Sequence, residues 1–118
     1  EIRLSLVGSE MCIRDSTWDE HVKDVVSIVV ATTAQVATWW RTPVEFLFLD
    51  GNHVEEMAQH DYAAFAPHVS VGGLLAVHDV FPDPADGGQA PWHVVERALG
   101  DGFEQVSQTG SLRILRRR

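Results

Sequence analysis

Two short polar motifs in this 118-residue sequence carry side chains that could do chemistry together. The first runs from Asp50 through a Gly-Asn pair to His53, and the second is the dipeptide His78-Asp79. Each motif directly follows an apolar run that is typical of a buried strand. Two carboxylates with nearby water suit Mg²⁺, which favours oxygen ligands and keeps several waters. We therefore expect Asp50 and Asp79 to share one ion or ligand if their strands pair.

Each of these residues also has a simpler interpretation. Asp50 could be a carboxylate at a helix N-terminus, where it stabilises the helix dipole, and Asp79 could be an ordinary loop acid. Histidines also cap helices and pack, which is the alternative for His53 and His78.

Two strands must position the motifs. Residues 44–49 are nearly all apolar, as in a strand of a parallel sheet covered on both faces. Residues 74–77 form a second apolar run after a turn at Gly72-Gly73. In parallel sheets with alternating helices, ligands bind beyond the carboxyl ends of the strands. Adjacent strand tips lie about 5 Å apart, so both motifs would fall in one crevice.

The remaining elements complete an alternating α/β order. Before residue 44 we expect a buried strand over residues 25–30 and a short helix over residues 33–40, which Thr32 or Thr33 caps and Pro43 ends. The next helix has apolar Val54, Met57, Ala58 and Phe65 and ends at Pro67. After the second strand we expect a loop over residues 81–91, a helix with apolar Trp92, Val95 and Leu99 that Gly100 or Gly102 closes, and a hairpin of residues 103–108 and 112–115.

Composition limits the classes of function. The length fits one domain, and the hydrophobic fraction of 45% allows a real core. A net charge of −8 argues against nucleic acid as a partner. No apolar run is long enough to span a bilayer, and Cys12 is a single cysteine, which fits a reducing compartment. We expect a cytoplasmic protein with no membrane partner, and its oligomeric state stays open.

The beginning of the chain has a different origin in our interpretation. Residues 6–16, Leu-Val-Gly-Ser-Glu-Met-Cys-Ile-Arg-Asp-Ser, resemble the conceptual translation of a transposase adapter used in preparing DNA sequencing libraries. We therefore expect residues 1–16 to be non-native and residues 17–118 to be the C-terminal part of a single domain. The alternative is a genuine strand-and-loop start.

A family resemblance emerges from the motifs together. The run from Glu45 to His53, the pairs Asp61-Tyr62 and Gly72-Gly73, and the run Val77-His78-Asp79 resemble the class I S-adenosylmethionine-dependent methyltransferases. The branch is the one with an Asp-Gly-Asp-His-Ser-Tyr-type motif, the cephalosporin hydroxylase and macrocin O-methyltransferase group. The resemblance covers roughly residues 25–115. It implies a partial Rossmann-like methyltransferase fold with a mostly parallel sheet, a C-terminal antiparallel hairpin and its first strand–helix units missing.

The resemblance also implies an activity and a role for each site residue. The cofactors would be S-adenosylmethionine and a divalent cation, expected to be Mg²⁺, and the substrate a small-molecule hydroxyl. Asp50 would hold the metal and lie close to the cofactor. Asp79 would be a second metal ligand with His78 beside it, and His53 would act as the general base. A cation lowers the pKa of a hydroxyl and a base accepts its proton.

The sequence departs from the family pattern in several places. Asn52 replaces an acid, Val54-Glu55 replaces Ser-Tyr, and Val71 replaces a proline. The glycine-rich loop and the ribose-binding acid of the first two units are not found, so the chain would lack most of its cofactor site and could be inactive alone. Two alternatives stay open. The Gly-Asn-His run also matches the dimetal phosphoesterases, and the domain could be a non-catalytic binding or interface module.

Overall fold

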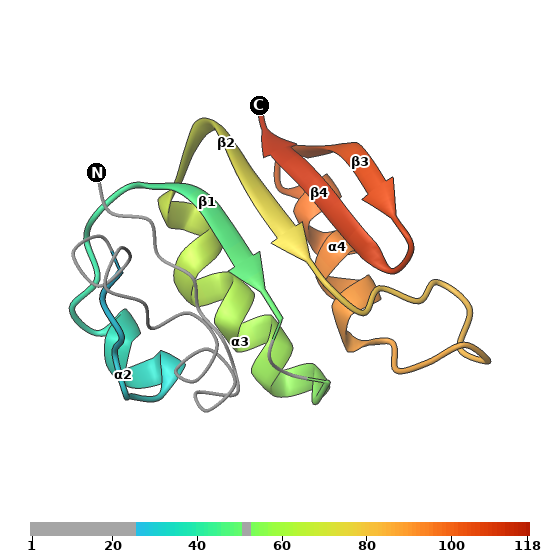
Figure 1. Cartoon of the computed structure of the whole chain (residues 1–118), viewed down its shortest axis with the longest axis horizontal. Coiled ribbons are helices and arrows are strands. Elements are labelled where there is room, and N and C mark those ends of the chain that lie inside the picture. The colour runs from blue at the N-terminus through green and yellow to red at the C-terminus, as the bar shows by residue number, and fades with distance from the viewer. Residues whose placement is uncertain (1–25, 51–52) are drawn as a thin grey trace.

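A four-stranded sheet with helices against it forms the described part of the chain (Figure 1). The computed structural model describes residues 26–50 and 53–118, so the adapter-like segment, Cys12 and the Gly-Asn pair lie outside it. The elements in chain order are α2 (Thr33–Ala37), β1 (Val44–Leu49), α3 (Glu55–Phe65), η1 (Ala66–His68), β2 (Val69–Val77), α4 (Ala90–Gly100), β3 (Phe103–Thr109) and β4 (Leu112–Arg117). The strand order is β1-β2-β4-β3.

The first two strands pair in parallel. Their register is regular at the carboxyl ends, where Phe46 lies opposite Leu74 and Leu49 opposite Val77. The expected turn at the glycine pair is wrong, because β2 begins at Val69 and runs through both glycines. The register shifts there, Gly72 adopts a φ of +84°, and a Cβ on Gly73 would lie 2.8 Å from the carbonyl oxygen of Ser70. The glycines therefore allow an irregular strand and do not end it.

The last two strands form the expected hairpin. β4 pairs antiparallel with both β2 and β3, and the chain turns at Gly110, whose φ is +58°. The observed strands β3 (Phe103–Thr109) and β4 (Leu112–Arg117) end one and two residues beyond the predicted ends. The α/β fold class and the antiparallel hairpin are confirmed. Within the described residues the parallel pairing is confined to β1 and β2.

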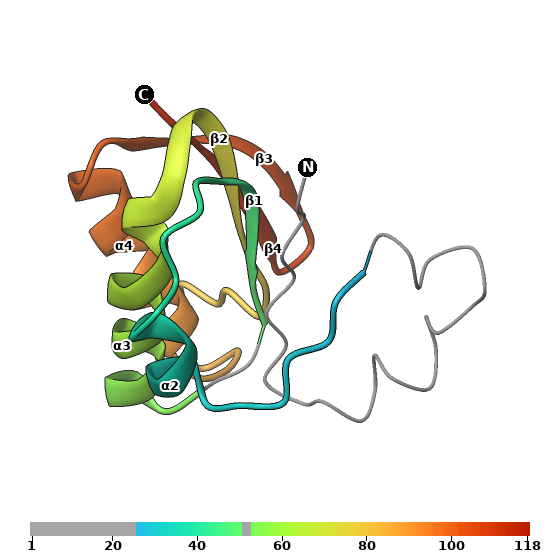
Figure 2. The same cartoon turned by 90° about the vertical axis from the view of Figure 1, so that its left-hand side faces the viewer.

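The core lies between the sheet and its helices. Leu47, Leu75 and Leu115 are fully buried on three neighbouring strands. Figure 2 shows α2, α3 and α4 on the same side of the sheet. The expectation that residues 44–49 are buried on both faces is therefore wrong for the described residues. Phe46, which does not share the buried face of Leu47, stays 42% exposed.

Helix α3 presents a different face from the expected one. Its buried residues are Ala58, Tyr62 and Phe65, which follow the four- and three-residue spacing of one helix face. Met57 is 53% exposed, and Val54 is the residue before the helix, so helical spacing does not apply to it. In α4, Val94, Val95 and Ala98 are buried and the helix ends at Gly100, whereas Leu99 is exposed.

The expected first strand is also wrong. Residues 26–30 form no strand, and Val30 is 69% exposed. A β-branched run becomes a strand only where a neighbouring strand supplies hydrogen-bond partners, and no described strand lies beside it.

Helix α2 is shorter than predicted, but Thr32 is its N-cap, with a reciprocal capping box to Gln35. Among the described helices, none combines the length and apolarity needed to cross a bilayer.

Candidate functional site

The paired strands bring the two polar motifs together. Because β1 and β2 are parallel and in register at their ends, Asp50 and His78 follow strand residues that lie opposite each other. The backbone N–H of His78 donates to the carbonyl oxygen of Leu49 over 3.2 Å, which extends the pairing one residue beyond the strands. The prediction that both strand tips meet at one edge of the sheet is confirmed.

His78 lies between the two carboxylates. Its Nδ1 atom is 3.0 Å from Oδ1 of Asp50 and 3.3 Å from Oδ1 of Asp79. One potential ligand atom from each residue lies within 4.8 Å of the other two. The side chains are 30–41% exposed, so they face solvent while their backbones are held by the sheet. This arrangement leaves the cluster accessible to a ligand.

The donor atoms fit a divalent cation. An ion with six ligands at about 2.1 Å places neighbouring ligand atoms about 3.0 Å apart, close to the two separations around His78. Carboxylate oxygens and an imidazole nitrogen are both established metal ligands. The chemistry and spacing of Asp50, His78 and Asp79 therefore suit one bound ion.

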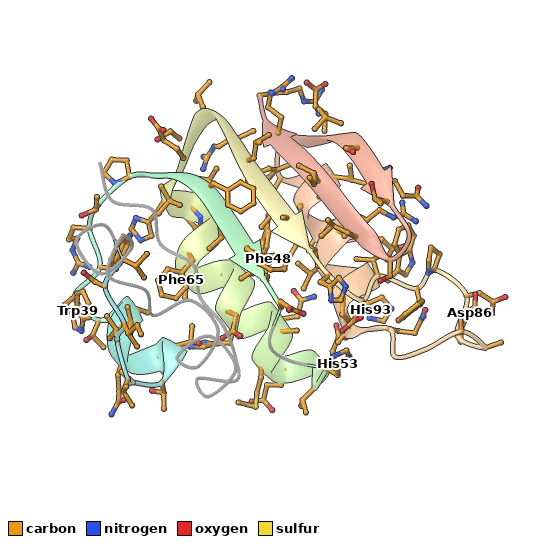
Figure 3. The ribbon with its side chains drawn as sticks, in the orientation of Figure 1. Trp39, Phe48, His53, Phe65, Asp86 and His93 are labelled. Atoms are coloured by element: carbon orange, nitrogen blue, oxygen red, sulfur yellow. The ribbon has the colours of Figure 1, made fainter. Side chains whose placement is uncertain are left out.

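His53 joins this cluster through Asp79. Its Nε2 atom lies 3.2 Å from Oδ2 of Asp79, so the two carboxylate oxygens of Asp79 contact different histidines. Figure 3 shows His53 at the end of the segment between β1 and α3. Its Nδ1 faces Gly88, where a Cβ would lie 3.9 Å away, and the side chain is 58% exposed. A histidine with one nitrogen held by a carboxylate has its other nitrogen free to accept a proton.

Asp79 occupies an unusual backbone conformation. Its φ is +58°, and no other described non-glycine residue has a positive φ. The residue after it, Val80, is buried and donates its N–H to the carbonyl oxygen of Ser111 on the hairpin turn. The backbone is therefore fixed on both sides, and the left-handed conformation turns the Asp79 carboxylate toward the two histidines.

A second pair near the site was not anticipated from the sequence. Nδ1 of His93, in the first turn of α4, lies 3.0 Å from Oε2 of Glu55, the first residue of α3. His93 has no role predicted from the sequence. The topology could have indicated this contact, because helices that follow parallel strands begin at the same edge of the sheet. Only the three-dimensional arrangement shows that the two helix starts are in contact.

The Asp61-Tyr62 motif lies elsewhere. Tyr62 is buried in the C-terminal half of α3, and its hydroxyl donates to Oδ2 of Asp101 over 2.8 Å. Burial, and then the hydrogen bond and charge of Asp101, raise the pKa of the Tyr62 phenol. Burial also raises the pKa of Asp61, which a hydrogen bond from Thr33 partly offsets. These residues connect helices and are not part of the candidate site.

Comparison with protein families identifies the class. The methyltransferase domain family matches residues 8–80, which is more than half of the chain and includes both polar motifs. The chain belongs to this family. The matched range begins inside the adapter-like segment, whose foreign origin stays a prediction.

Solved structures agree on the fold. The O-methyltransferase NovP is 21% identical, with a TM-score of 0.64 over 92% of this chain and 43% of NovP. An rRNA methylase from Streptococcus thermophilus is 13% identical, with a TM-score of 0.60 over 98% of this chain and 73% of its own. A Streptococcus mutans protein described as a methyltransferase, in complex with SAH, is 11% identical, with a TM-score of 0.59 over 98% and 76%. The chain thus spans less than half of NovP.

The backbone of Asp79 gives a test of whether its side chain serves stability. A left-handed conformation is unfavourable for a residue with a Cβ, by roughly 1–2 kcal/mol, and glycine avoids this penalty. We expect Asp79→Gly to leave the free energy of unfolding unchanged or to raise it by up to about 1 kcal/mol, measured by urea denaturation. The control is Asp83→Gly, at a loop position without a positive φ, which should lower stability. A larger loss for Asp79→Gly than for Asp83→Gly would make the Asp79 carboxylate a structural element.

Proposed function

We propose that this chain is part of an S-adenosylmethionine-dependent methyltransferase that methylates a hydroxyl group of a small molecule with the help of a divalent cation. The observation that carries the proposal is the meeting of Asp50, His78 and Asp79 at the tips of β1 and β2. Membership of the methyltransferase domain family supports the reaction class. The O-methyltransferase NovP shares the fold, and another structure with this fold holds SAH, the form of the cofactor left after methyl transfer.

Asp50 is the described residue expected to contact the cofactor. It directly follows β1, at the end of the sheet where the two polar motifs meet. S-adenosylmethionine supplies an electrophilic methyl group on a positively charged sulfur. The Asp50 carboxylate would favour the positive charge and would also help to hold the cation, together with His78 and Asp79.

The chemistry requires a proton acceptor. In methyl transfer the substrate oxygen forms a bond to the methyl carbon while the carbon–sulfur bond breaks, and the hydroxyl proton must leave. A bound cation would lower the pKa of that hydroxyl. His53 is placed to take the proton: with the Nε2–H donating to Asp79, its Nδ1 is the free acceptor. Asp79 would hold the ring in this tautomer and orientation.

Removing either carboxylate tests the metal assignment. In the full-length protein we expect Asp50→Asn and Asp79→Asn each to lower metal-dependent methylation by about 100-fold or more, because a cation contributes several kcal/mol of transition-state stabilisation. Asparagine keeps the side-chain shape and tolerates the positive φ of Asp79. Asp86→Asn, at an exposed loop position away from the cluster (Figure 3), is the matched control and should retain activity.

Circular dichroism of the same variants separates loss of chemistry from loss of fold. Unchanged methylation in a folded Asp50→Asn or Asp79→Asn variant would refute the metal assignment.

Removing His53 tests the general base. We expect His53→Ala to lower turnover by roughly 10²–10⁴-fold, with little change in affinity for S-adenosylmethionine, because the base acts on the acceptor hydroxyl and not on the cofactor. Turnover is measured at saturating substrate and affinity by calorimetry. His60→Ala, on the exposed side of α3, is the control. An equal loss of turnover and of cofactor affinity would make His53 a structural residue.

Calorimetry also discriminates the two alternatives from the sequence. Binding of S-adenosylmethionine by the full-length protein supports the methyltransferase. Metal binding with cleavage of a phosphoester would instead support a dimetal phosphoesterase, and the absence of both activities would support a binding module.

A further inference from the structure

The imidazole of His78 makes the candidate metal site a mixed nitrogen and oxygen site. We infer that this site selects a first-row transition-metal dication for which imidazole is a good ligand, such as Fe²⁺, Co²⁺ or Zn²⁺, over Mg²⁺. The inference rests on the proposed metal-assisted function and deepens it by naming the class of ion. It also departs from the Mg²⁺ expected from the two carboxylates alone.

The orientation of His78 is the first support. Its Nδ1 lies within hydrogen-bonding distance of both acids, at 3.0 and 3.3 Å, so an ion that replaces the Nδ1 proton would meet the ring nitrogen and the two carboxylate oxygens together. The His78 backbone is fixed by its hydrogen bond to Leu49. The sheet therefore fixes the backbone from which this nitrogen projects.

The second support is the availability of ligand atoms. The Oδ2 atom of Asp79 is in contact with His53, which leaves its Oδ1 facing His78. His53 is outside the group whose ligand atoms lie within 4.8 Å of one another. The protein would thus offer an ion one oxygen from Asp79, one or two from Asp50, and the Nδ1 of His78.

This donor set favours particular ions for reasons of charge and softness. Mg²⁺ gains most from charged oxygen ligands and water and gains little from a neutral nitrogen. Imidazole is a good ligand for Fe, Zn, Ni and Cu, and affinities at nitrogen-containing sites rise from Mn²⁺ toward Cu²⁺. A neutral imidazole where a third carboxylate could stand also lowers the negative charge that would attract Mg²⁺. The imidazole of His78 therefore raises the affinity of the site for transition-metal ions relative to Mg²⁺.

The test compares wild-type full-length protein with His78→Asp, which converts the site to oxygen ligands only. Affinities for Co²⁺ and Mg²⁺ are measured by calorimetry, and pulsed electron paramagnetic resonance of the Mn²⁺ form detects a directly bound nitrogen. We expect nitrogen coupling in the wild type and none in His78→Asp. The ratio of Co²⁺ to Mg²⁺ affinity should fall about tenfold or more in that variant.

A second histidine variant provides the matched control. His93→Asn removes an imidazole that contacts Glu55 and not the acids of the site, so nitrogen coupling and the affinity ratio should both persist. Circular dichroism confirms that each variant is folded. If folded His78→Asp binds no ion, nitrogen coupling of Mn²⁺ in the wild type is compared with that in His93→Asn. Coupling in both proteins would still support a directly bound histidine nitrogen other than that of His93.

Several results would overturn the inference. They are Mn²⁺ bound to the wild type without nitrogen coupling, an affinity ratio unchanged in His78→Asp, or no ion bound by the wild type. The proposed function fails separately. Nitrogen-coupled metal in a protein that never methylates would refute the methyltransferase proposal alone, whereas methylation supported by Mg²⁺ without nitrogen coupling would refute the ion preference alone.

Discussion

The parallel pairing of β1 with β2 determines where Asp50 and His78 of the candidate site lie. Leu49 lies opposite Val77, and the hydrogen bond from His78 to Leu49 continues the ladder past the last strand residues. A shift of one residue would turn each side chain to the other face of the sheet. Burial of Leu47 and Leu75 against the helices opposes such a shift, so the same packing that forms the core also fixes the site.

Asp79 connects this framework to the chemistry. It holds a backbone conformation that side chains rarely adopt, and its two oxygens contact His78 and His53. The buried Val80, anchored to the hairpin turn, prevents the backbone from relaxing. An unfavourable conformation that surrounding structure enforces is common at functional sites, and here it accompanies the contact of one carboxylate with two histidines.

The sequence predicted the elements whose patterns are local and strong. The apolar run of residues 44–49 and the turn residues of the hairpin each specify their structure within a few neighbours, and so the strand tips with Asp50 and Asp79 were identified. The prediction of a strand at residues 25–30 failed because a strand depends on a neighbouring strand that the local sequence pattern does not reveal. The prediction for the glycine pair failed for a related reason: glycine permits a turn or an irregular strand equally, and the pairing of β2 with β1 on both sides of the glycines decides between them.

The candidate site was predictable by residue type and only partly by arrangement. Strand ends predicted that Asp50, His78 and Asp79 would meet, but not that the Nδ1 of His78 would be the atom between the acids, because side-chain rotamers and the φ of Asp79 follow from tertiary packing. The contact of His93 with Glu55 joins residues 38 positions apart on two helices, and neither residue carries a local signal for it.

A crystal structure of the full-length protein soaked in Mn²⁺, with anomalous scattering data, tests most directly whether two strand tips hold one ion. The expected result is a single anomalous peak within bonding distance of Asp50, His78 and Asp79. A structure in which these side chains point apart, or in which Mn²⁺ binds only elsewhere, would contradict the central claim.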